Sequence, residues 1–432
     1  MAPSPLPSVP PPPETSAPPP GAWHRRTFAS FAFPNYRWFF FGQGTSVVGM
    51  WMKDAAQGWL VFLLTGSYAS LGTVTAISRG ALGAATPLGG LAADRTDRRR
   101  LLMLLSVLSA ATSLALGALV LGGDVTVLQV AILAGLSGAV KGFEIPTRQA
   151  FVVEMVGREH LANAIALNTA MFNSARVLGP LLAGFVMYGS ERGIAACFLA
   201  DGVTYLAILY SLGRIRPLPT ETDRSAAGPG ERLREALAYA WGTLRVRVLI
   251  LLLAVFITFA WSYLTILPAF AKTELGLDTR GFGALMALNG LGALAGAVWV
   301  ASRPVPTDRR ALRRTVFGAV ALSAVSVAAF GYAPTPALAG AALVLAGFGG
   351  VGFLSRGNTL VQVAVPDRLR GRVMSLWVLV FIGGMAAGGF LLGWAAERFG
   401  PRAAVSASGA ACLLLAAALY ASLPPVRDPG TP

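Results

Sequence analysis

The sequence predicts an all-α polytopic membrane protein with twelve transmembrane helices in two pseudo-symmetric six-helix bundles. Hydrophobic residues make up 55% of the chain and charged residues only 13%, against about 25% charged residues in an ordinary soluble domain. Apolar segments long enough to cross a bilayer recur along the whole sequence. The net charge of +15 is concentrated in the connections between these segments, which is typical of a membrane protein and argues against nucleic-acid binding.

Twelve segments match the template for a membrane helix, which needs about 20 mostly apolar residues. In order along the chain they are 38–65, 71–93, 100–121, 126–148, 163–188, 194–213, 246–271, 281–302, 314–332, 336–356, 373–395 and 403–423. Because twelve is an even number, both termini are expected on the same side of the membrane.

The less apolar stretches divide the chain into predicted domains. These are a Pro-rich cytoplasmic tail (1–27), an N-terminal six-helix bundle (28–213), a cytoplasmic linker (214–245), a C-terminal six-helix bundle (246–424) and a C-terminal tail (425–432). The N-terminal tail is expected to be disordered because proline-rich sequence cannot bury a core, and it lacks the charged start and apolar run of a signal peptide. Within the linker, apolar residues at helical spacing from Glu231 to Trp241 predict an amphipathic surface helix.

The distribution of basic residues orients the chain in the membrane. Of the 35 lysines and arginines, 26 fall on the side of the N-terminus and five on the opposite side, while Lys53, Arg79, Lys141 and Arg176 lie within spans. The positive-inside rule therefore predicts that both termini are cytoplasmic.

The two halves of the chain resemble each other. Gly184 in the fifth predicted span corresponds to Gly393 in the eleventh, and Gly89 in the second span corresponds to Gly296 in the eighth, at nearly the same separation along the chain. A near-constant separation indicates duplication of a six-helix unit, which is common among transporters.

A charged turn joins the second and third predicted spans. It contains Gly90, Asp94, Arg95, Arg98 and Arg99 within ten residues. We expect Asp94 to accept hydrogen bonds from Arg98 or Arg99 and to face the positive N-terminus of a neighbouring helix, such as the one that starts near residue 372. This cytoplasmic latch would favour the state closed to the cytoplasm. The alternative interpretation is that the charges only fix the topology.

The turn and its neighbours resemble the major facilitator superfamily. The turn matches the signature between the second and third helices of that superfamily. Further motifs narrow the resemblance: Trp51-Met52, Ala56-Gln57-x-Trp59-Leu60-Val61, Leu64-Thr65-x-Ser67, Pro146-x-Arg148-Gln149 and Arg176-x2-Gly179-Pro180-x2-Ala183-Gly184. Together they are similar to the branch that contains the enterobactin exporter and macrolide efflux proteins. The resemblance implies a secondary transporter of the major facilitator fold.

Small residues and one proline are expected to bend and closely pack the fifth and eleventh predicted helices. The positions are Gly179, Pro180, Gly184, Gly388 and Gly393. Proline removes a backbone hydrogen bond and glycine removes bulk. In the superfamily, the fifth-helix pattern resembles that of exporters, although helix packing alone would also favour these residues.

Charged residues inside spans are the candidates for proton coupling, because each is costly in a bilayer unless it is paired or hydrated. The candidates are Asp54, Arg79, Lys141, Glu144 and Arg176. Asp54 and Arg79 lie at similar depths, about 16 Å and about 12 Å from the outer ends of their helices at 1.5 Å per residue, which permits an ion pair. We hypothesise that Asp54 or Glu144 carries the proton. The alternative is that both acids are permanently ionised and paired, as we also expect for Asp201.

Polar and aromatic residues within spans are candidates for the wall of a substrate cavity. In the first half, Gln43, Met50 and Gln57 share a helical face with Asp54. In the second half, where no span is expected to carry a charge, the candidates are Trp261, Tyr263, Asn289 and Asn358.

Taken together, these features predict a monomeric secondary transporter in a bacterial cytoplasmic membrane. It would export an amphipathic organic compound, a drug or a siderophore, against protons. An importer of a small organic solute is the alternative with the same architecture, while a channel or membrane-embedded enzyme is less favoured. No cofactor is expected: the chain lacks a phosphate-binding loop for ATP, and its two cysteines and two histidines form no pattern for a metal.

Overall fold

The structure is a computed structural model that describes residues 28–216, 229–303 and 309–423, and within these ranges it is helical without strands. The helices are η1 (Ala29–Ala32), α2 (Pro34–Thr65), α3 (Tyr68–Arg95), α4 (Arg98–Gly122), α5 (Val127–Val186), α6 (Glu191–Arg214), α7 (Pro229–Gly242), α8 (Leu244–Val255), η2 (Phe256–Trp261), α9 (Tyr263–Thr273), α10 (Thr279–Ala301), α11 (Arg309–Gly331), α12 (Pro336–Ala364), α13 (Asp367–Phe399) and α14 (Pro401–Ala421). The predicted tails and residues 217–228 of the predicted linker lie outside the described residues.

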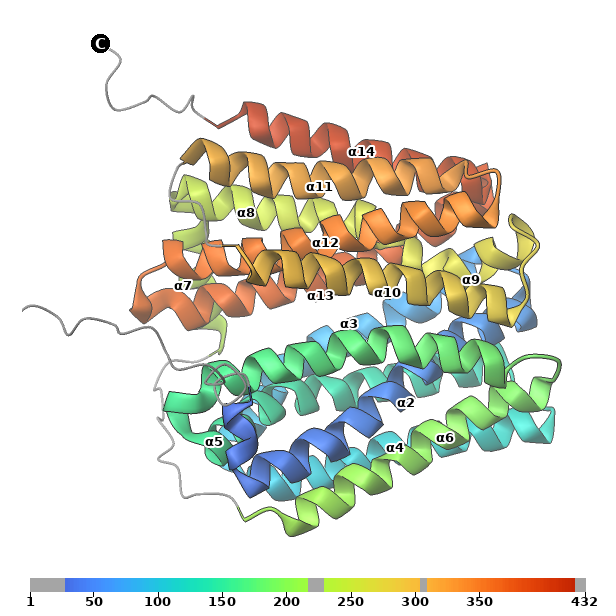
Figure 1. Ribbon diagram of the computed structural model, residues 1–432, viewed down its shortest axis with the longest axis horizontal. Coiled ribbons are helices and arrows are strands. Elements are labelled where there is room, and N and C mark those ends of the chain that lie inside the picture. The colour runs from blue at the N-terminus through green and yellow to red at the C-terminus, as the bar shows by residue number, and fades with distance from the viewer. Residues whose placement is uncertain (1–27, 217–228, 304–308, 424–432) are drawn as a thin grey trace, which may run out of the picture.

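The long helices form two groups that lie side by side (Figure 1). Helices α2 to α6 pack against one another in the first group, and helices α8 to α14 do so in the second. The groups meet mainly where α3 packs against α13 and where α5 packs against α10. The short helix α7 packs against α13 with Ala236 and Ala240 buried, whereas Leu237 and Trp241 on the predicted apolar face are exposed.

Nine segments of the described chain are long and apolar enough to cross a membrane. Three of the twelve expected spans fall short of that hydropathy: 38–65, 71–93 and 163–188. They coincide with α2, α3 and the second part of α5, which carry Lys53 and Asp54, Arg79, and Arg176, respectively. The same buried charges that mark candidate sites therefore lower the hydropathy of these three helices.

Two predicted segments differ in detail from the structure. The expected connection 149–162 is helical, and α5 is interrupted only at Gly157, whose φ of 70° suits glycine. The expected span 246–271 is not one regular helix but α8, the π-helical turn η2 and α9. A π-helical turn inside a longer helix shifts the positions of the side chains that follow and is frequent at functional sites.

The buried core shows how the two groups are joined. We call the end of the molecule that holds Thr96, Ile215 and Ser302 the basic end, and the end that holds Gly66 and Gly276 the opposite end. At the opposite end, one hydrophobic cluster combines residues of both groups. At the basic end, each group has a separate cluster of its own. The groups therefore share a core at one end only.

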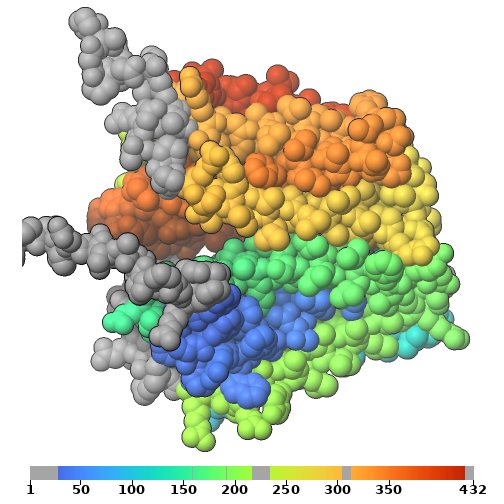
Figure 2. All heavy atoms as spheres, in the orientation of Figure 1, coloured from blue at the N-terminus to red at the C-terminus, as the bar shows by residue number. Residues whose placement is uncertain are grey.

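Polar contacts follow the same division. The hydrogen bonds between described residues of the two groups lie at the opposite end, where Tyr68 bonds Thr273 and Thr279 bonds Gly184, or in the middle, where Arg176 bonds Asn289. The surface between the groups is closed towards the opposite end and hollowed towards the basic end (Figure 2). The described part of the molecule is thus closed at the opposite end and open at the basic end.

Candidate functional site

One acid and two bases from three helices meet inside the first group. Asp54 of α2 lies 3.7 Å from the Nζ atom of Lys141 on α5 and 3.8 Å from a guanidinium nitrogen of Arg79 on α3. All three side chains are partly buried. The ion pair expected between Asp54 and Arg79 is present, and Lys141 adds a second cation. The carboxylate of Asp54 thus faces two positive charges, one from α3 and one from α5.

The neighbouring residue of α2 makes a second and deeper pair. Lys53 lies 3.8 Å from Asp201 on α6, and the two side chains are 4% and 0% exposed. Lys53 also donates to Ser137 at 3.1 Å, and Ser113 donates to Asp201 at 2.6 Å. The other carboxylate oxygen of Asp201 is buried and has no hydrogen-bond partner among the described residues. Asp201 is therefore a paired residue, as expected, although one of its oxygens remains unsatisfied.

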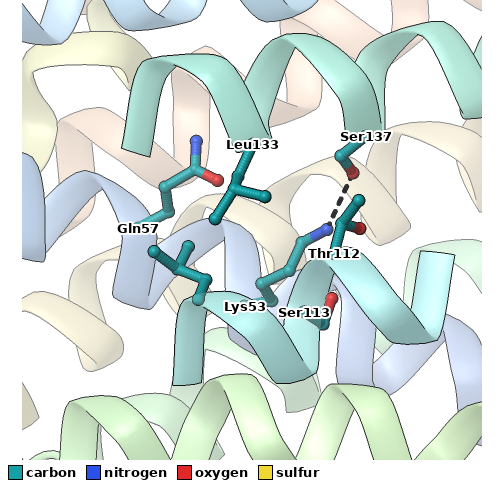
Figure 3. A pocket seen from close by; sticks show the side chains of 7 residues that line it. Lys53, Gln57, Thr112, Ser113, Leu133 and Ser137 are labelled. Atoms are coloured by element: carbon teal, nitrogen blue, oxygen red, sulfur yellow. Dashed lines mark hydrogen bonds between the residues drawn. The ribbon is translucent and has the colours of Figure 1, made fainter. Parts of the chain in front are cut away.

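A small cavity lies beside Lys53 (Figure 3). Its volume is about 10 Å³, which is close to the space that one water needs. The wall combines polar and aliphatic side chains: Lys53, Gln57, Thr112, Ser113, Leu116, Leu133 and Ser137. Gln57, expected in a substrate cavity, thus faces a space too small for an organic substrate in this state.

Glu144 of α5 is not part of the Asp54 cluster, although it lies only three residues after Lys141. Arg148, one turn further along, donates to Glu144 at 2.7 Å and places its guanidinium 5.0 Å from the ring of Phe172. Lys141, Glu144 and Arg148 are spaced three and four residues apart, which would allow all three to pair along the helix, but Lys141 pairs with Asp54. Side chains three residues apart are neighbours on a helix surface, yet Lys141 pairs across to α2 and Glu144 pairs along α5.

A third polar cluster lies where the two groups meet in the middle of the molecule. Arg176 of α5 is 8% exposed and donates to Asn289 of α10 at 2.7 Å. Asn289 in turn donates to Tyr263 of α9 at 2.6 Å. The guanidinium of Arg176 lies 5.8 Å from the ring of Trp51 and 4.8 Å from that of Trp261. Three residues expected to line a cavity thus surround a buried arginine.

The remaining cavity candidates are less closely connected to these clusters. Gln43 is buried in α2, whereas Met50 of α2 and Asn358 of α12 are half-buried.

Helix α12 carries a buried charge. Arg356 is 3% exposed and lies inside the helix. The expectation that spans of the second half carry no charge is therefore wrong. The predicted span ended at residue 356, whereas the helix continues to Ala364.

The charged turn between α3 and α4 does not form the expected contacts in this state. Asp94 and Arg95 are exposed, and Gly90 has open space beside it. Arg98 pairs with Glu154 at 2.6 Å, and Arg99 donates to the carbonyl oxygens of Leu212 and Gly213. The two arginines thus bind the first group instead of Asp94. Because the basic end is open, the latch stays a prediction for a closed state.

Glycines allow the two groups to approach closely at the opposite end. A Cβ atom on Gly184 would lie 2.6 Å from the carbonyl oxygen of Thr279, and one on Gly393 would lie 2.6 Å from that of Tyr68. Two other glycines pack within their own groups: Gly179 lies against Trp51, and Gly388 lies against Ser262. Pro180 lies within α5, where it cannot donate a backbone hydrogen bond.

Sequence reasoning missed a carboxylate at the opposite end. Glu397, near the end of α13, accepts hydrogen bonds from the backbone N–H groups of Tyr68 and Ala69 and from the hydroxyl of Ser67. These groups form the N-terminus of α3, whose partial positive charge attracts an anion. The only signal in the sequence is an acid at the end of an apolar segment, which does not indicate its partner.

Long helices in two groups, buried charges within them and a core shared at one end define a multi-pass membrane transporter. Residues 25–429 match the model of the family described as Transmembrane secretion effector. The chain therefore belongs to this family, within the major facilitator superfamily.

Curated relatives and solved structures agree with this assignment. The enterobactin exporter EntS of Salmonella typhimurium is 25% identical over 92% of this chain and 96% of its own length. EntS of Escherichia coli O1:K1 is 25% identical over 91% of this chain and 93% of its own length.

Among solved structures, a bacterial homologue of the human lysosomal transporter Spinster has a TM-score of 0.71 at 16% identity, over 90% of this chain and 96% of its own. A D-xylose–proton symporter has a TM-score of 0.69 at 15% identity, over 89% of this chain and 98% of its own. These structures share the fold. The chain is a transporter and not an enzyme.

Proposed function

We propose that this protein exports a siderophore-like or drug-like amphipathic compound by alternating access, coupled to the inward movement of protons. It would lie in the bacterial cytoplasmic membrane as a monomer, with both termini and the basic end on the cytoplasmic side. The similarity to enterobactin exporters over more than nine tenths of the chain supports export. The basic residues gathered at one end support this orientation.

One observation carries the alternating-access proposal: the two groups of helices share a core at the opposite end and have separate cores at the basic end. Residues 28–213 and 246–424 would move as two bodies around the central contact of Arg176 with Asn289. Separation at the opposite end and approach at the basic end would then expose the centre of the molecule to the other side. In that state, Asp94 could reach the N-terminus of a neighbouring helix.

The cluster of Asp54, Arg79 and Lys141 would couple this movement to protons. Its members come from α2, α3 and α5, and both α3 and α5 also contact the second group. A shift of α3 or α5 against the second group therefore changes the distance of a cation from Asp54. When the cations withdraw, Asp54 takes up a proton, and when they return it releases the proton.

Transport by everted membrane vesicles under an imposed pH gradient tests this proposal. A macrolide, a tetracycline and an iron-free siderophore would serve as substrates. We expect Asp54→Asn to reduce gradient-driven uptake into the vesicles at least about tenfold, because a neutral residue cannot exchange a proton. Exchange of substrate without a gradient should persist.

Two variants of other acids serve as controls. Glu144→Gln is the test of the second acid, which pairs with Arg148, and Asp278→Asn changes an exposed acid at the start of α10. Both should retain most of the activity. Full gradient-driven transport by Asp54→Asn and by Glu144→Gln would refute proton coupling through either acid, and uptake in the reverse direction would favour an importer.

A further inference from the structure

Arg176 is a buried cation that has no counter-ion among the residues the structure describes. In the described part of the chain its polar side-chain contact is Asn289, a neutral amide, and no carboxylate forms an ion pair with it, in contrast to Lys53 and Lys141. A buried charge that lacks an opposite charge is costly unless another group neutralises it. The cost is tolerable if the charge serves to bind an anion.

The groups around Arg176 offer hydrogen-bond donors and few acceptors. Asn289 uses its oxygen to accept from Arg176 and its nitrogen to donate to Tyr263 and to the carbonyl oxygen of Leu343. Tyr263 accepts from Asn289, which leaves its own O–H free to donate. The indole nitrogen of Trp51 is buried and has no hydrogen-bond partner among the described residues. Spare N–H and O–H donors around a cation suit a ligand with anionic oxygens.

Two indole rings add an aromatic component to this site. Trp51 comes from α2 of the first group, and Trp261 is the last residue of the π-helical turn η2 in the second group. Both rings lie within 6 Å of the guanidinium of Arg176. Side chains from both groups therefore meet at one point, and a ligand held there contacts both moving bodies. An aromatic ring can stack on an indole while its anionic substituent reaches the arginine.

We propose that Arg176, Trp51 and Tyr263 form a subsite for an aromatic carboxylate, so that the exported compound carries an anionic aromatic group. Arg176 neutralises the carboxylate, the N–H of Trp51 and the O–H of Tyr263 donate to it, and the indoles hold the ring. This proposal rests on the proposed transport function and names the chemical class of its substrate. It also gives Arg176 a role in substrate binding instead of proton coupling.

Isothermal titration calorimetry on the purified full chain in detergent tests this subsite without any proton gradient. Three probes separate charge from aromaticity: salicylate is anionic and aromatic, salicylamide is aromatic and neutral, and cyclohexanecarboxylate is anionic without an aromatic ring. We expect salicylate to bind at least about tenfold more tightly than either of the others. Equal binding of salicylate and salicylamide would overturn the proposal, as would the absence of salicylate binding at millimolar concentrations.

Variants connect the binding to the named residues. Arg176→Gln should weaken salicylate binding at least about tenfold and leave salicylamide unchanged, because a charge-assisted contact is lost. Trp51→Phe keeps a ring but removes the N–H, and should weaken salicylate about fivefold. Arg214→Gln is a matched control, because Arg214 also stacks on an aromatic ring, that of Tyr210, but outside the site.

Two further outcomes decide the proposal. Unchanged salicylate binding by Trp51→Phe and Arg176→Gln would overturn the subsite, and the thermal unfolding midpoint of each variant shows that it is folded. If salicylate binds as expected while the vesicle assay shows no gradient-driven export, the proton-coupled function fails and the anion subsite stands.

Discussion

At the scale of single residues, adjacent charges on α2 have different partners. Lys53 and Asp54 are neighbours in sequence, and their side chains therefore point in directions about 100° apart on the helix. Lys53 turns inward to Asp201, where both side chains are almost completely buried. Asp54 turns to Arg79 and Lys141, where all three side chains keep some exposure. The proposed coupling requires an acid that a proton can reach, and of these two pairs only the Asp54 cluster keeps some exposure.

The Lys53–Asp201 pair gives a stability prediction. Asp201→Asn leaves the ammonium of Lys53 buried without a counter-ion, and the loss of one partner of a buried pair costs about 3–5 kcal/mol. We therefore expect a large decrease in the thermal unfolding midpoint in detergent.

The double variant Lys53→Met with Asp201→Leu should recover most of this loss, because it removes both charges and fills the space with apolar groups. Asp54→Asn is a comparison variant, which we expect to destabilise less because its partners are partly exposed. If Asp201→Asn unfolds at the temperature of the parent, Lys53 and Asp201 do not form a stabilising pair.

Sequence reasoning at this scale found most of the charges but only some of the pairs that they form. Similar depths of Asp54 and Arg79 along their helices indicated a pair correctly. The pairing of Lys53 with Asp201, and of Lys141 with Asp54 rather than Glu144, depends on which helices are neighbours. The depth of a residue along its helix can be counted from the sequence. The arrangement of the five helices around one another cannot be read from it. The predicted roles of these residues in coupling stay predictions.

At the scale of helices, the ends of α3 and α13 hold the two groups together. The carboxylate of Glu397 faces the N-terminus of α3, and Gly72 of α3 packs against Gly389 and Gly393 of α13. A backbone hydrogen bond from Gly281 holds the pKa of Asp278 below its ordinary value at the start of α10, so this second helix N-terminus also has an ionised acid at neutral pH. Of these two acids, Glu397 connects the two groups, whereas Asp278 caps its own helix.

The contact of Glu397 with α3 predicts that it keeps the opposite end closed. Glu397→Gln removes the negative charge at the N-terminus of α3, a contribution of about 1 kcal/mol, which corresponds to about a fivefold change in population. The probe is Thr75→Cys, because Thr75 lies against Gly389 between the two groups. We expect a membrane-impermeant maleimide, added from the side of the opposite end, to label this cysteine about fivefold faster in the Glu397→Gln background.

Glu274 provides the matched control for this experiment. It is a carboxylate at the same end, but its partner Arg402 belongs to the same group of helices. Glu274→Gln should therefore leave the labelling rate unchanged. If Thr75→Cys is labelled at the same rate with and without the Glu397→Gln substitution, the carboxylate does not hold the groups together.

At the scale of the whole molecule, the sequence predicts the class of fold because hydropathy reports where the chain crosses a membrane. The hydropathy signal is weaker for three helices. Lys53, Asp54, Arg79 and Arg176 make α2, α3 and the second part of α5 less apolar. The state of the molecule could not be predicted. Under the proposed alternating access, one sequence must allow both an opening at the basic end and its closure, so the sequence alone does not select one of the two states.

The turn around Asp94 provides the corresponding prediction for the basic end. Spin labels at Arg100→Cys on α4 and Ser302→Cys beyond α10 report the separation of the two groups at this end, since both positions are exposed, while the native Cys197 and Cys412 are buried. In lipid, the distance distribution should contain a long component for the open state and a short component for the closed state. If Asp94 faces a helix N-terminus in the closed state, Asp94→Asn should reduce the short component about fivefold, for a loss of about 1 kcal/mol.

The comparison with Asp97 separates a latch from a general effect of charge in this turn. Asp97 lies three residues from Asp94 and caps α4 through the backbone N–H of Arg100, so Asp97→Asn removes the same charge but retains a side chain that can cap the helix. We expect the populations of this variant to match those of the parent. An equal loss of the short component in both variants would mean that the turn acts through its total charge. An unchanged distribution in Asp94→Asn would mean that the turn determines only the orientation of the chain in the membrane, because a latch must stabilise one state more than the other.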